Sequence, residues 1–251
     1  MITATGLELR VGARLLLAAA SFRVAAGDRI GLVGRNGAGK TTLTKVLAGE
    51  GQPAAGQVTR SGDIGYLPQD PRTGDLEVLA RSRILSARGL DEIVAKMREA
   101  EGQMASADPE THERAMRRYS RLEAEFVSKG GYAAESEAAS FAASLGLPER
   151  VLSQPLHTLS GGQRRRVELA RILFSGAGTL LLDEPTNHLD VDSVVWLRDY
   201  LKTFPGGLIV ISHDVALVEQ CVNKVFHLDA NRCELDIYNC LLYTSDAADE
   251  L

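Results

Sequence analysis

Alternating apolar and polar positions mark the first 33 residues of the chain as a series of short β-strands. Leu7, Leu9 and Val11 alternate with polar or small residues, which is the period of a strand with one buried face. The apolar run at 29–33 is typical of a strand that is buried on both faces. The elements predicted next are a helix at 41–48 and strands at 56–60 and 64–68.

Between residues 90 and 146 the apolar spacing changes to the three- and four-residue period of helices. The second predicted helix begins at Asp108-Pro109, with the aspartate as N-cap and the proline in the first turn, and ends at Gly130. A third helix is predicted over about 132–145. One face of the first predicted helix carries Leu90, Ile93, Val94, Met97 and Met104. The first two helices are expected to form an antiparallel hairpin that projects from the rest.

Strand-like and helix-like segments alternate again from residue 158 to residue 238. The predicted helices cover 163–174, 191–202 and 215–221, and the predicted strands cover 179–182, 208–211, 224–228 and 234–238. This alternation predicts an α/β fold with a largely parallel sheet. The short strands at both ends of the chain are expected to form an accessory antiparallel sheet.

A glycine-rich loop joins the strand at 29–33 to the first predicted helix. A glycine, four free positions and Gly-Lys-Thr in this context are typical of a phosphate-binding loop, because glycines let N–H groups converge beside a helix N-terminus. Lys40 is expected to contact the outer phosphates and Thr41 to contact Mg²⁺. The alternative is a glycine-rich turn before an ordinary helix. The nucleotide-binding residues predicted in this loop are Gly34, Asn36, Gly37, Gly39, Lys40, Thr41 and Thr42.

Two carboxylates follow the apolar run that ends at Leu182. Ligands of open α/β sheets lie at the carboxyl ends of the strands, which is where Asp183 and Glu184 are predicted to lie. Asp183 is expected to hold Mg²⁺ through water, and Glu184 to orient or deprotonate an attacking water. In isolation, an Asp-Glu-Pro turn is also typical of helix capping.

A second helix N-terminus offers another anion site. One triphosphate already has a loop at Lys40, so this second site predicts a composite pocket shared by two copies of the domain. His213, at the end of a buried strand, is either structural or a contact for the outermost phosphate. The residues predicted at the second helix N-terminus are Ser160, Gly161, Gly162 and Gln163.

The second predicted helix carries a stripe of arginines at i, i+3, i+4 and i+7, expected to lie opposite Met116, Tyr119 and Phe126. Such a stripe binds RNA phosphates in some proteins. Pairs at i, i+4 with neighbouring glutamates indicate instead an ordinary solvated helix face. The stripe consists of Arg114, Arg117, Arg118 and Arg121, and the pairs are Glu110–Arg114, Glu113–Arg117 and Arg121–Glu125.

Composition adds limits to this interpretation. The 251 residues are 45% hydrophobic, which is ordinary for a globular protein, and carry a formal net charge of −5. Any RNA contact must therefore come from a local patch. Cys221, Cys233 and Cys240 lack the spacing of metal ligands, and this cysteine usage suits a reducing compartment. No apolar run approaches the length of a membrane span, so a cytoplasmic protein without membrane insertion is predicted.

Taken in order, the motifs resemble those of ABC ATPases. They match Walker A (Gly34–Thr42), Q-loop (Gln69), signature (Leu159–Gln163), Walker B with D-loop (Leu180–Asp190) and switch histidine (His213). The resemblance implies a P-loop ABC-type nucleotide-binding cassette over 1–239, with an inserted helical arm at about 75–157. It implies ATP and Mg²⁺ as cofactors, with Glu184, His213 and Gln69 as catalytic residues. It assigns Mg²⁺ binding to Thr41, Gln69 and Asp183.

The run 182–190 is most similar to the F subfamily, soluble twin-cassette ATPases that act on ribosomes as translation factors or in antibiotic resistance. This resemblance implies a second cassette as partner and an arm whose arginines reach ribosomal RNA and tRNA. The alternative is the ATP-binding subunit of an ABC membrane transporter, against which the long helical hairpin argues. A third possibility is a scaffold that binds nucleotide without hydrolysing it.

The sequence departs from the family pattern in two places. ABC cassettes usually stack an aromatic residue on adenine, and no aromatic occurs near Val11, so weak base selectivity is expected. The chain carries one cassette, so weak hydrolysis is expected without a second one. Residues 240–251 resemble the translation of a sequencing adapter, and the natural sequence is expected to end near Asn239; the alternative is a genuine acidic tail.

Overall fold

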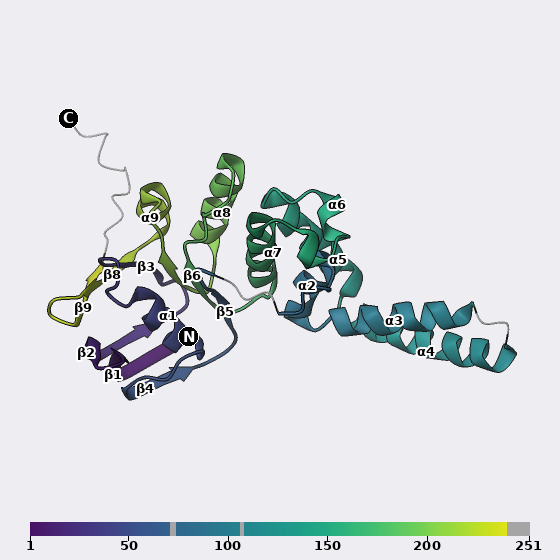
Figure 1. Ribbon diagram of the computed structural model, residues 1–251, viewed down its shortest axis with the longest axis horizontal. Helices are drawn as coiled ribbons and strands as arrows, with labels where there is room; N and C mark the ends of the chain where they lie inside the picture. The colour runs from purple at the N-terminus through teal and green to yellow at the C-terminus, as the bar shows by residue number, and fades with distance from the viewer. Residues whose placement is uncertain (71–73, 106–107, 240–251) are drawn as a thin grey trace, which may run out of the picture. The chain divides into compact units, whose positions relative to one another are not determined.

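The computed structural model describes residues 1–70, 74–105 and 108–239. It divides into two compact units, each of which is described by itself. The sheet unit comprises Met1–Asp70, Ala177–Asn187 and the chain from Val194 onwards, and the helical unit comprises Pro71–Gly176 and His188–Ser193. Figure 1 labels their elements. The predicted adapter-derived tail at 240–251 lies outside the described residues.

A six-stranded sheet forms the centre of the sheet unit, in the order β5-β6-β7-β3-β8-β9. All pairings are parallel except that of β9 with β8. Every residue of β6 and β7 is buried, as expected for parallel strands covered on both faces. The strands are β3 (Arg29–Val33), β5 (Ile64–Leu67), β6 (Thr179–Asp183), β7 (Gly207–Ile211), β8 (Lys224–Asp229) and β9 (Glu234–Asn239).

A three-stranded antiparallel sheet accompanies it, in the order β2-β1-β4. The prediction of an accessory sheet is correct for the N-terminal strands and wrong for the C-terminal ones. Phe226 of β8 pairs with Leu32 of β3, and both side chains are buried, which holds β8 in the main sheet. The accessory strands are β1 (Ile2–Val11), β2 (Arg14–Val24) and β4 (Ala55–Arg60).

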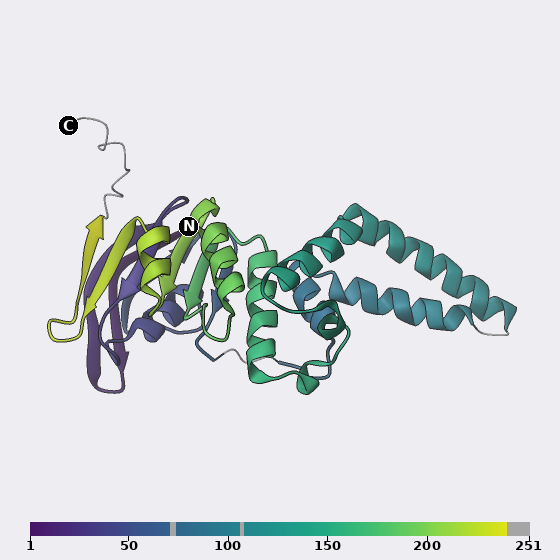
Figure 2. The same cartoon turned by 90° about the horizontal axis from the view of Figure 1, so that it is seen from above.

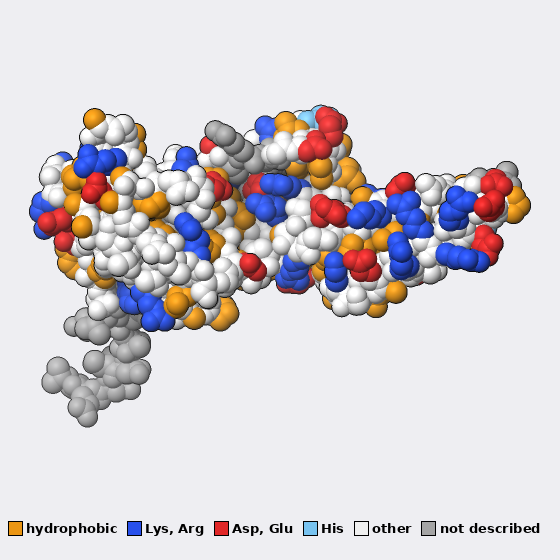
Figure 3. Space-filling model, turned by 90° about the horizontal axis from the view of Figure 1, so that it is seen from below, with side chains coloured by type: hydrophobic (Ala, Val, Ile, Leu, Met, Phe, Trp, Pro, Cys, Tyr) orange, Lys and Arg blue, Asp and Glu red, His pale blue; other side chains and the backbone are white. Residues whose placement is uncertain are grey.

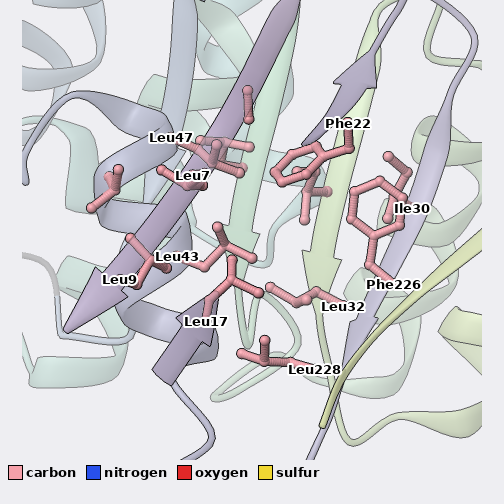
Figure 4. Close-up of a cluster of buried hydrophobic side chains, with 14 of the residues drawn as sticks. Leu7, Leu9, Leu17, Phe22, Ile30, Leu32, Leu43, Leu47, Phe226 and Leu228 are labelled. Carbon is pink, nitrogen blue, oxygen red and sulfur yellow. The ribbon is translucent and has the colours of Figure 1, made fainter. Parts of the chain in front are cut away.

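The core of the sheet unit lies between these sheets and helix α1 (Lys40–Ala48) (Figure 4). Leu43 and Leu47 of α1 are fully buried, and burial of each leucine is worth about 1.5–3 kcal/mol. Phe22 of the accessory sheet meets Phe226 edge to face, with ring centroids 5.2 Å apart. This packing fixes the position of α1, and so of the glycine-rich loop that precedes it.

Two further helices of the sheet unit are α8 (Val191–Thr203), which belongs to it from Val194, and α9 (Val215–Cys221). A methyl group added at Gly31 of β3 would lie 3.4 Å from Val218 and from Val222, so α9 packs directly on the main sheet. All three predicted helices of this unit are present.

The helical unit contains a long antiparallel hairpin of α3 and α4 (Figure 2). Asp108 is the N-cap of α4, as predicted, and its carboxylate accepts a hydrogen bond from the Thr111 amide at 3.0 Å. The short helices α2 and α6 were not predicted. The helices are α2 (Ala80–Leu85), α3 (Asp91–Met104), α4 (Pro109–Ser128), α5 (Gly131–Ser144), α6 (Glu149–Leu152) and α7 (Gly161–Phe174), with 3₁₀ turns at Ser86–Arg88 and Leu156–Thr158.

The predicted apolar side of α4 is wrong in one position. Met116 is 49% exposed, whereas the buried residues are Ala115, Leu122 and Phe126. The buried residues repeat at seven and four positions, the spacing that faces a partner helix, and Met116 lies about 100° away around the helix. Within the described residues, no helix is both long and apolar enough to cross a bilayer.

Candidate functional site

The glycine-rich loop has a backbone that only glycine accommodates at two places. Gly34 has a φ of 154°, and a Cβ there would lie 2.7 Å from the Leu228 carbonyl oxygen. Gly39 has a φ of 105°, and a Cβ there would lie 3.0 Å from Leu16 Cδ1. Both backbone freedom and close packing therefore require glycine at these positions.

Lys40 lies across this loop as the first residue of α1. Its ammonium donates hydrogen bonds to the carbonyl oxygens of Gly34 at 2.7 Å and Arg35 at 3.2 Å. Gly39 precedes the helix and supplies no side-chain cap. The first N–H groups of α1 thus meet no capping side chain, and a helix N-terminus of this kind favours an anion.

Thr41 and Asp183 bring oxygen atoms together from two elements. The Thr41 hydroxyl, on α1, donates a 2.8 Å hydrogen bond to the Asp183 carboxylate at the end of β6. Asp183 is buried. The described residues contain no group of three or more histidine, cysteine or acidic side chains that could hold a metal. Two hard oxygen ligands without a full protein cage fit Mg²⁺, which takes its other ligands from water and phosphates.

Glu184 has an unusual backbone for a residue with a side chain. Its φ is 51°, and its amide donates a 2.8 Å hydrogen bond to the Ile211 carbonyl of β7. Its carboxylate accepts a 3.3 Å hydrogen bond from the His213 amide, and His213 Nε2 lies 3.5 Å from Oε1. The His213 side chain is 78% exposed, so it is not a buried structural histidine. The carboxylate and the imidazole are thus neighbours in a position that ligands can reach.

Two buried polar side chains, Thr44 and Tyr66, lie close to these groups. Thr44, which is fully buried, donates to the carbonyl oxygens of Lys40 at 3.3 Å and Thr41 at 3.1 Å. Burial raises the pKa of Tyr66 to about 12, and the nearby Asp183 charge acts in the same direction as burial. The phenol therefore stays neutral and leaves Asp183 without a competing charge.

The phosphate-loop residues, the two carboxylates and His213 line one cleft of about 580 Å³. All of the residues that line it belong to the sheet unit. The predicted site residues that it brings together are Asn36, Gly37, Gly39, Lys40, Thr41, Thr42, Gln69, Asp183, Glu184 and His213. Gly34 shapes the loop without lining the cleft. Lining residues that the sequence analysis did not assign are Val11, Arg14, Leu16, Asn187 and Ile211. Two of them had a sequence signal: Val11 stands where the family has an aromatic residue, and Asn187 lies inside the matched run Leu180–Asp190.

The predicted second anion site forms the N-terminus of α7 in the helical unit. The Ser160 hydroxyl accepts a hydrogen bond from the Gln163 amide at 3.2 Å, and the Gln163 side chain accepts one from the Ser160 amide at 2.9 Å. These two hydrogen bonds form a reciprocal capping box. Gly161, the first residue of the helix, is exposed, and a Cβ added there would have no neighbour within 4 Å. Gly162 packs against His188, whose Cβ would lie 3.4 Å from an added methyl group.

The arginine stripe of α4 is largely engaged with glutamates. Arg114 pairs with Glu110 and Arg117 with Glu113, as the solvated-face interpretation predicts. Arg118 instead crosses to Glu99 of α3, with 2.7 Å between donor and acceptor. The predicted Arg121–Glu125 pair is wrong, because Glu125 pairs with Lys129. Figure 3 shows basic and acidic side chains interspersed along the α3–α4 hairpin.

The family of the chain follows from comparison with known proteins. The sequence model of the ABC transporter family matches residues 17–187, which is more than half of the chain. The chain therefore belongs to the ABC transporter family, whose cassettes bind and hydrolyse ATP. The predicted P-loop cassette fold with an antiparallel sheet and a helical insertion is confirmed.

Three curated relatives cover nearly all of the chain. The ATP-binding protein YdiF of Bacillus subtilis is 38% identical over 230 residues, covering 91% of this chain and 36% of its own length. The tylosin resistance ATP-binding protein TlrC of Streptomyces fradiae is 35% identical, and the match covers 89% of this chain and 41% of TlrC. Human ATP-binding cassette sub-family F member 3 is also 35% identical, and the match covers 90% of this chain and 31% of the human protein. The chain thus spans about a third to two fifths of the length of these relatives.

A solved structure supports the fold. The ATP binding subunit of an ABC transporter has a TM-score of 0.69 with this chain at 19% sequence identity. The match covers 95% of this chain and 90% of the solved one. At this identity the likeness concerns the fold alone.

Proposed function

We propose that this chain is the ATP-hydrolysing cassette of an F-type ABC ATPase that acts on the ribosome, as a translation factor or a ribosome-protection protein. The observation that carries the ATPase part is the single cleft in which Lys40, Thr41, Asp183, Glu184 and His213 meet. The ribosomal part is supported by the similarity to a tylosin resistance protein and to a sub-family F member. A cytoplasmic location is part of the same proposal.

The loop residues bind the triphosphate of ATP. The Lys40 ammonium exchanges the loop carbonyls that it contacts for the outer phosphates, while the N–H groups at the start of α1 surround the inner ones. Thr41, Gln69 and Asp183 would hold Mg²⁺. When bound, Mg²⁺ supplies positive charge that offsets the charge of the outer phosphates. The hydrogen bond between Thr41 and Asp183 keeps these two oxygens in place beforehand.

Glu184 orients and deprotonates the attacking water. Its backbone is held by β7 and its carboxylate by the His213 amide, so the base has a fixed position before ATP arrives. The exposed His213 ring and Gln69 contact the terminal phosphate and respond to its loss. Attack by water transfers the terminal phosphoryl group and leaves ADP, and this transfer depends mainly on positioning and electrostatic stabilisation.

A second cassette completes the site. The exposed start of α7 is formed by Ser160, Gly161, Gly162 and Gln163. Its capping box uses the Ser160 and Gln163 amides, so the N–H groups of Gly161 and Gly162 are the ones offered to an anion. We infer that this helix start contacts the nucleotide of a partner cassette, either a second copy or the second cassette of a longer protein. The length of the relatives agrees with the latter. Weak hydrolysis by unpaired chains follows from this arrangement.

Ribosome co-sedimentation with the Glu184→Gln chain tests the proposed function. This variant retains ATP, so we expect it to pellet with purified ribosomes when ATP is present and to stay in solution without it. Lys40→Ala is the control, because it lacks the phosphate contact. Equal pelleting of both variants, or none, would contradict a role on the ribosome.

The arm has a test of its own. Exchanging Arg114, Arg117 and Arg121 for glutamine removes exposed charge from α4 and leaves the Arg118 bridge to α3 intact. We expect weaker ribosome binding with unchanged ATP binding, and a smaller dependence of ribosome binding on salt. Lys96→Gln and Lys129→Gln on the same hairpin serve as the comparison. Unchanged ribosome binding would remove the arm from the proposal.

The alternative function is that of an ATP-binding subunit of a membrane transporter. It is favoured by the general description of the matching family and by the solved structure of such a subunit. Co-purification of the chain with a membrane-spanning protein, together with no ribosome binding by Glu184→Gln, would favour it over the ribosomal function.

A further inference from the structure

One wall of the cleft is formed by the hairpin of β1 and β2. Val11 and Arg14 are directly paired across the two strands, at the last position before the turn at Gly12. Directly paired residues project on the same face of a sheet. Both line the cleft, and both are exposed.

A bulge connects this wall to the phosphate loop. The register passes from Arg10↔Leu15 to Leu9↔Leu17, which leaves Leu16 as an extra residue on β2. Leu16 packs directly on the loop, because a methyl group at Gly39 would lie 3.0 Å from its Cδ1 atom. Arg14 lies on the same face of β2, two residues closer to the hairpin turn than Leu16. Two residues of a strand span about 7 Å.

The phosphate loop fixes which end of a nucleotide lies where. With the phosphates at the start of α1, the wall of Leu16, Val11 and Arg14 is the part of the cleft that we assign to the sugar and base. No phenylalanine, tyrosine or tryptophan is among the described residues that line the cleft. The planar group of this wall is the guanidinium of Arg14.

The Arg14 side chain is available for such a contact. It makes no hydrogen bond or ion pair within the described part of the chain, whereas Arg10, on the opposite face of the hairpin, pairs with Glu8 at 2.6 Å. A guanidinium is planar and weakly hydrated, so it stacks on flat aromatic rings.

We propose that Arg14 holds the base of the bound nucleotide by stacking its guanidinium on the face of the base, with Val11 and Leu16 as apolar support. The inference rests on the proposed nucleotide site and extends it. Every base has such a face, so stacking without edge contacts discriminates little between bases. The substrate class is therefore nucleoside triphosphates in general, and GTP is accepted beside ATP.

Binding measurements with ATP, GTP and tripolyphosphate on the whole chain test this. We expect the unmodified chain to bind ATP and GTP with affinities within about tenfold of each other. Arg14→Ala should weaken both by about 3- to 10-fold and leave tripolyphosphate, which has no base, unchanged. Arg10→Ala is the matched control and should change none of the three.

Arg14→Lys separates stacking from charge. It keeps the positive charge and loses the plane, so we expect it to resemble Arg14→Ala with ATP and GTP. Recovery of affinity by lysine, a parallel loss of tripolyphosphate binding, or a loss confined to GTP would overturn the proposal. If Arg14→Ala matches Arg10→Ala while Lys40→Ala abolishes binding, this inference alone fails. If the unmodified chain binds none of the three ligands, the proposed function fails with it.

Discussion

Asp183 and Glu184 are neighbours in the sequence but have different surroundings in the folded chain. Asp183 ends β6 and accepts a hydrogen bond from Thr41. Glu184 turns the chain with a φ of 51°, which a residue with a side chain adopts only when its surroundings enforce it. The Ile211 carbonyl and the His213 amide provide that constraint. This difference underlies the proposed division between a metal ligand and a base.

Replacing Glu184 by glutamine should separate hydrolysis from binding. The amide keeps the size of the side chain but cannot accept a proton, so we expect turnover to fall roughly 10²–10⁴-fold with ATP affinity preserved. Phosphate release and binding of a fluorescent ATP analogue measure the two quantities. A parallel loss of both would mean that Glu184 holds the nucleotide or the fold, rather than serving as the base.

Much of the cleft could be predicted because motif residues are contiguous in the sequence and their chemistry is recognisable. Lys40 and Thr41 follow fixed glycine spacing, and Glu184 follows an apolar strand. Arg14 and Ile211 could not be found in this way. Arg14 reaches the cleft through the register and bulge of the β1–β2 hairpin, and Ile211 through its pairing with Asp183 at the end of β7, both of which only the folded chain defines.

At the scale of elements, the spacing of apolar residues predicted the main helices and strands but not every contact between them. The strand at 224–228 was predicted, yet its place beside β3 depends on Phe226 packing against Phe22. In α4, spacing alone did not separate Met116 from the buried Ala115 next to it. Both errors concern contacts between elements, which apolar periodicity does not specify.

The strand–loop–helix element that we propose binds phosphate should depend strongly on Gly34 for its stability. A Cβ there would lie 2.7 Å from the Leu228 carbonyl oxygen, so we expect Gly34→Ala to lower the free energy of unfolding by about 3 kcal/mol. Gly37 also has a positive φ but has open space around it, so Gly37→Ala should cost about 1 kcal/mol. Urea unfolding measures both. Equal losses would indicate that backbone conformation alone sets the cost.

The helical hairpin offers a matched pair for the corrected face of α4. Leu122 is 5% exposed, so Leu122→Ala should lower the free energy of unfolding of this region by about 2–5 kcal/mol. Met116→Ala should change it by less than about 0.5 kcal/mol because Met116 is exposed. Hydrogen exchange of the α3 and α4 amides reports the difference. A larger effect at Met116 would restore the original assignment.

At the scale of the whole molecule, the two sites that the proposed composite pocket needs lie in different compact units of the chain. The cleft with Lys40 belongs to the sheet unit, and the Ser160 helix start belongs to the helical unit. The chain spans about a third to two fifths of the length of its relatives. Its activity is therefore expected to depend on what it pairs with.

Gly161→Glu tests the helix start without harming the fold. The position has open space around it, and a negative charge is favourable in the first turn of a helix. The same charge would repel the phosphates of a partner's nucleotide. We expect normal thermal stability and normal ATP binding. The part of the ATP turnover that depends on pairing of two cassettes should be lost. Normal turnover in this variant would exclude the helix start from the site.

The dependence of ATP turnover on chain concentration tests the central claim most directly. If each cleft needs the Ser160 helix start of another cassette, turnover per chain should be weak when dilute and rise with concentration, and Gly161→Glu should abolish the rise. Robust turnover per chain that is the same at every concentration, and the same in Gly161→Glu, would contradict the account.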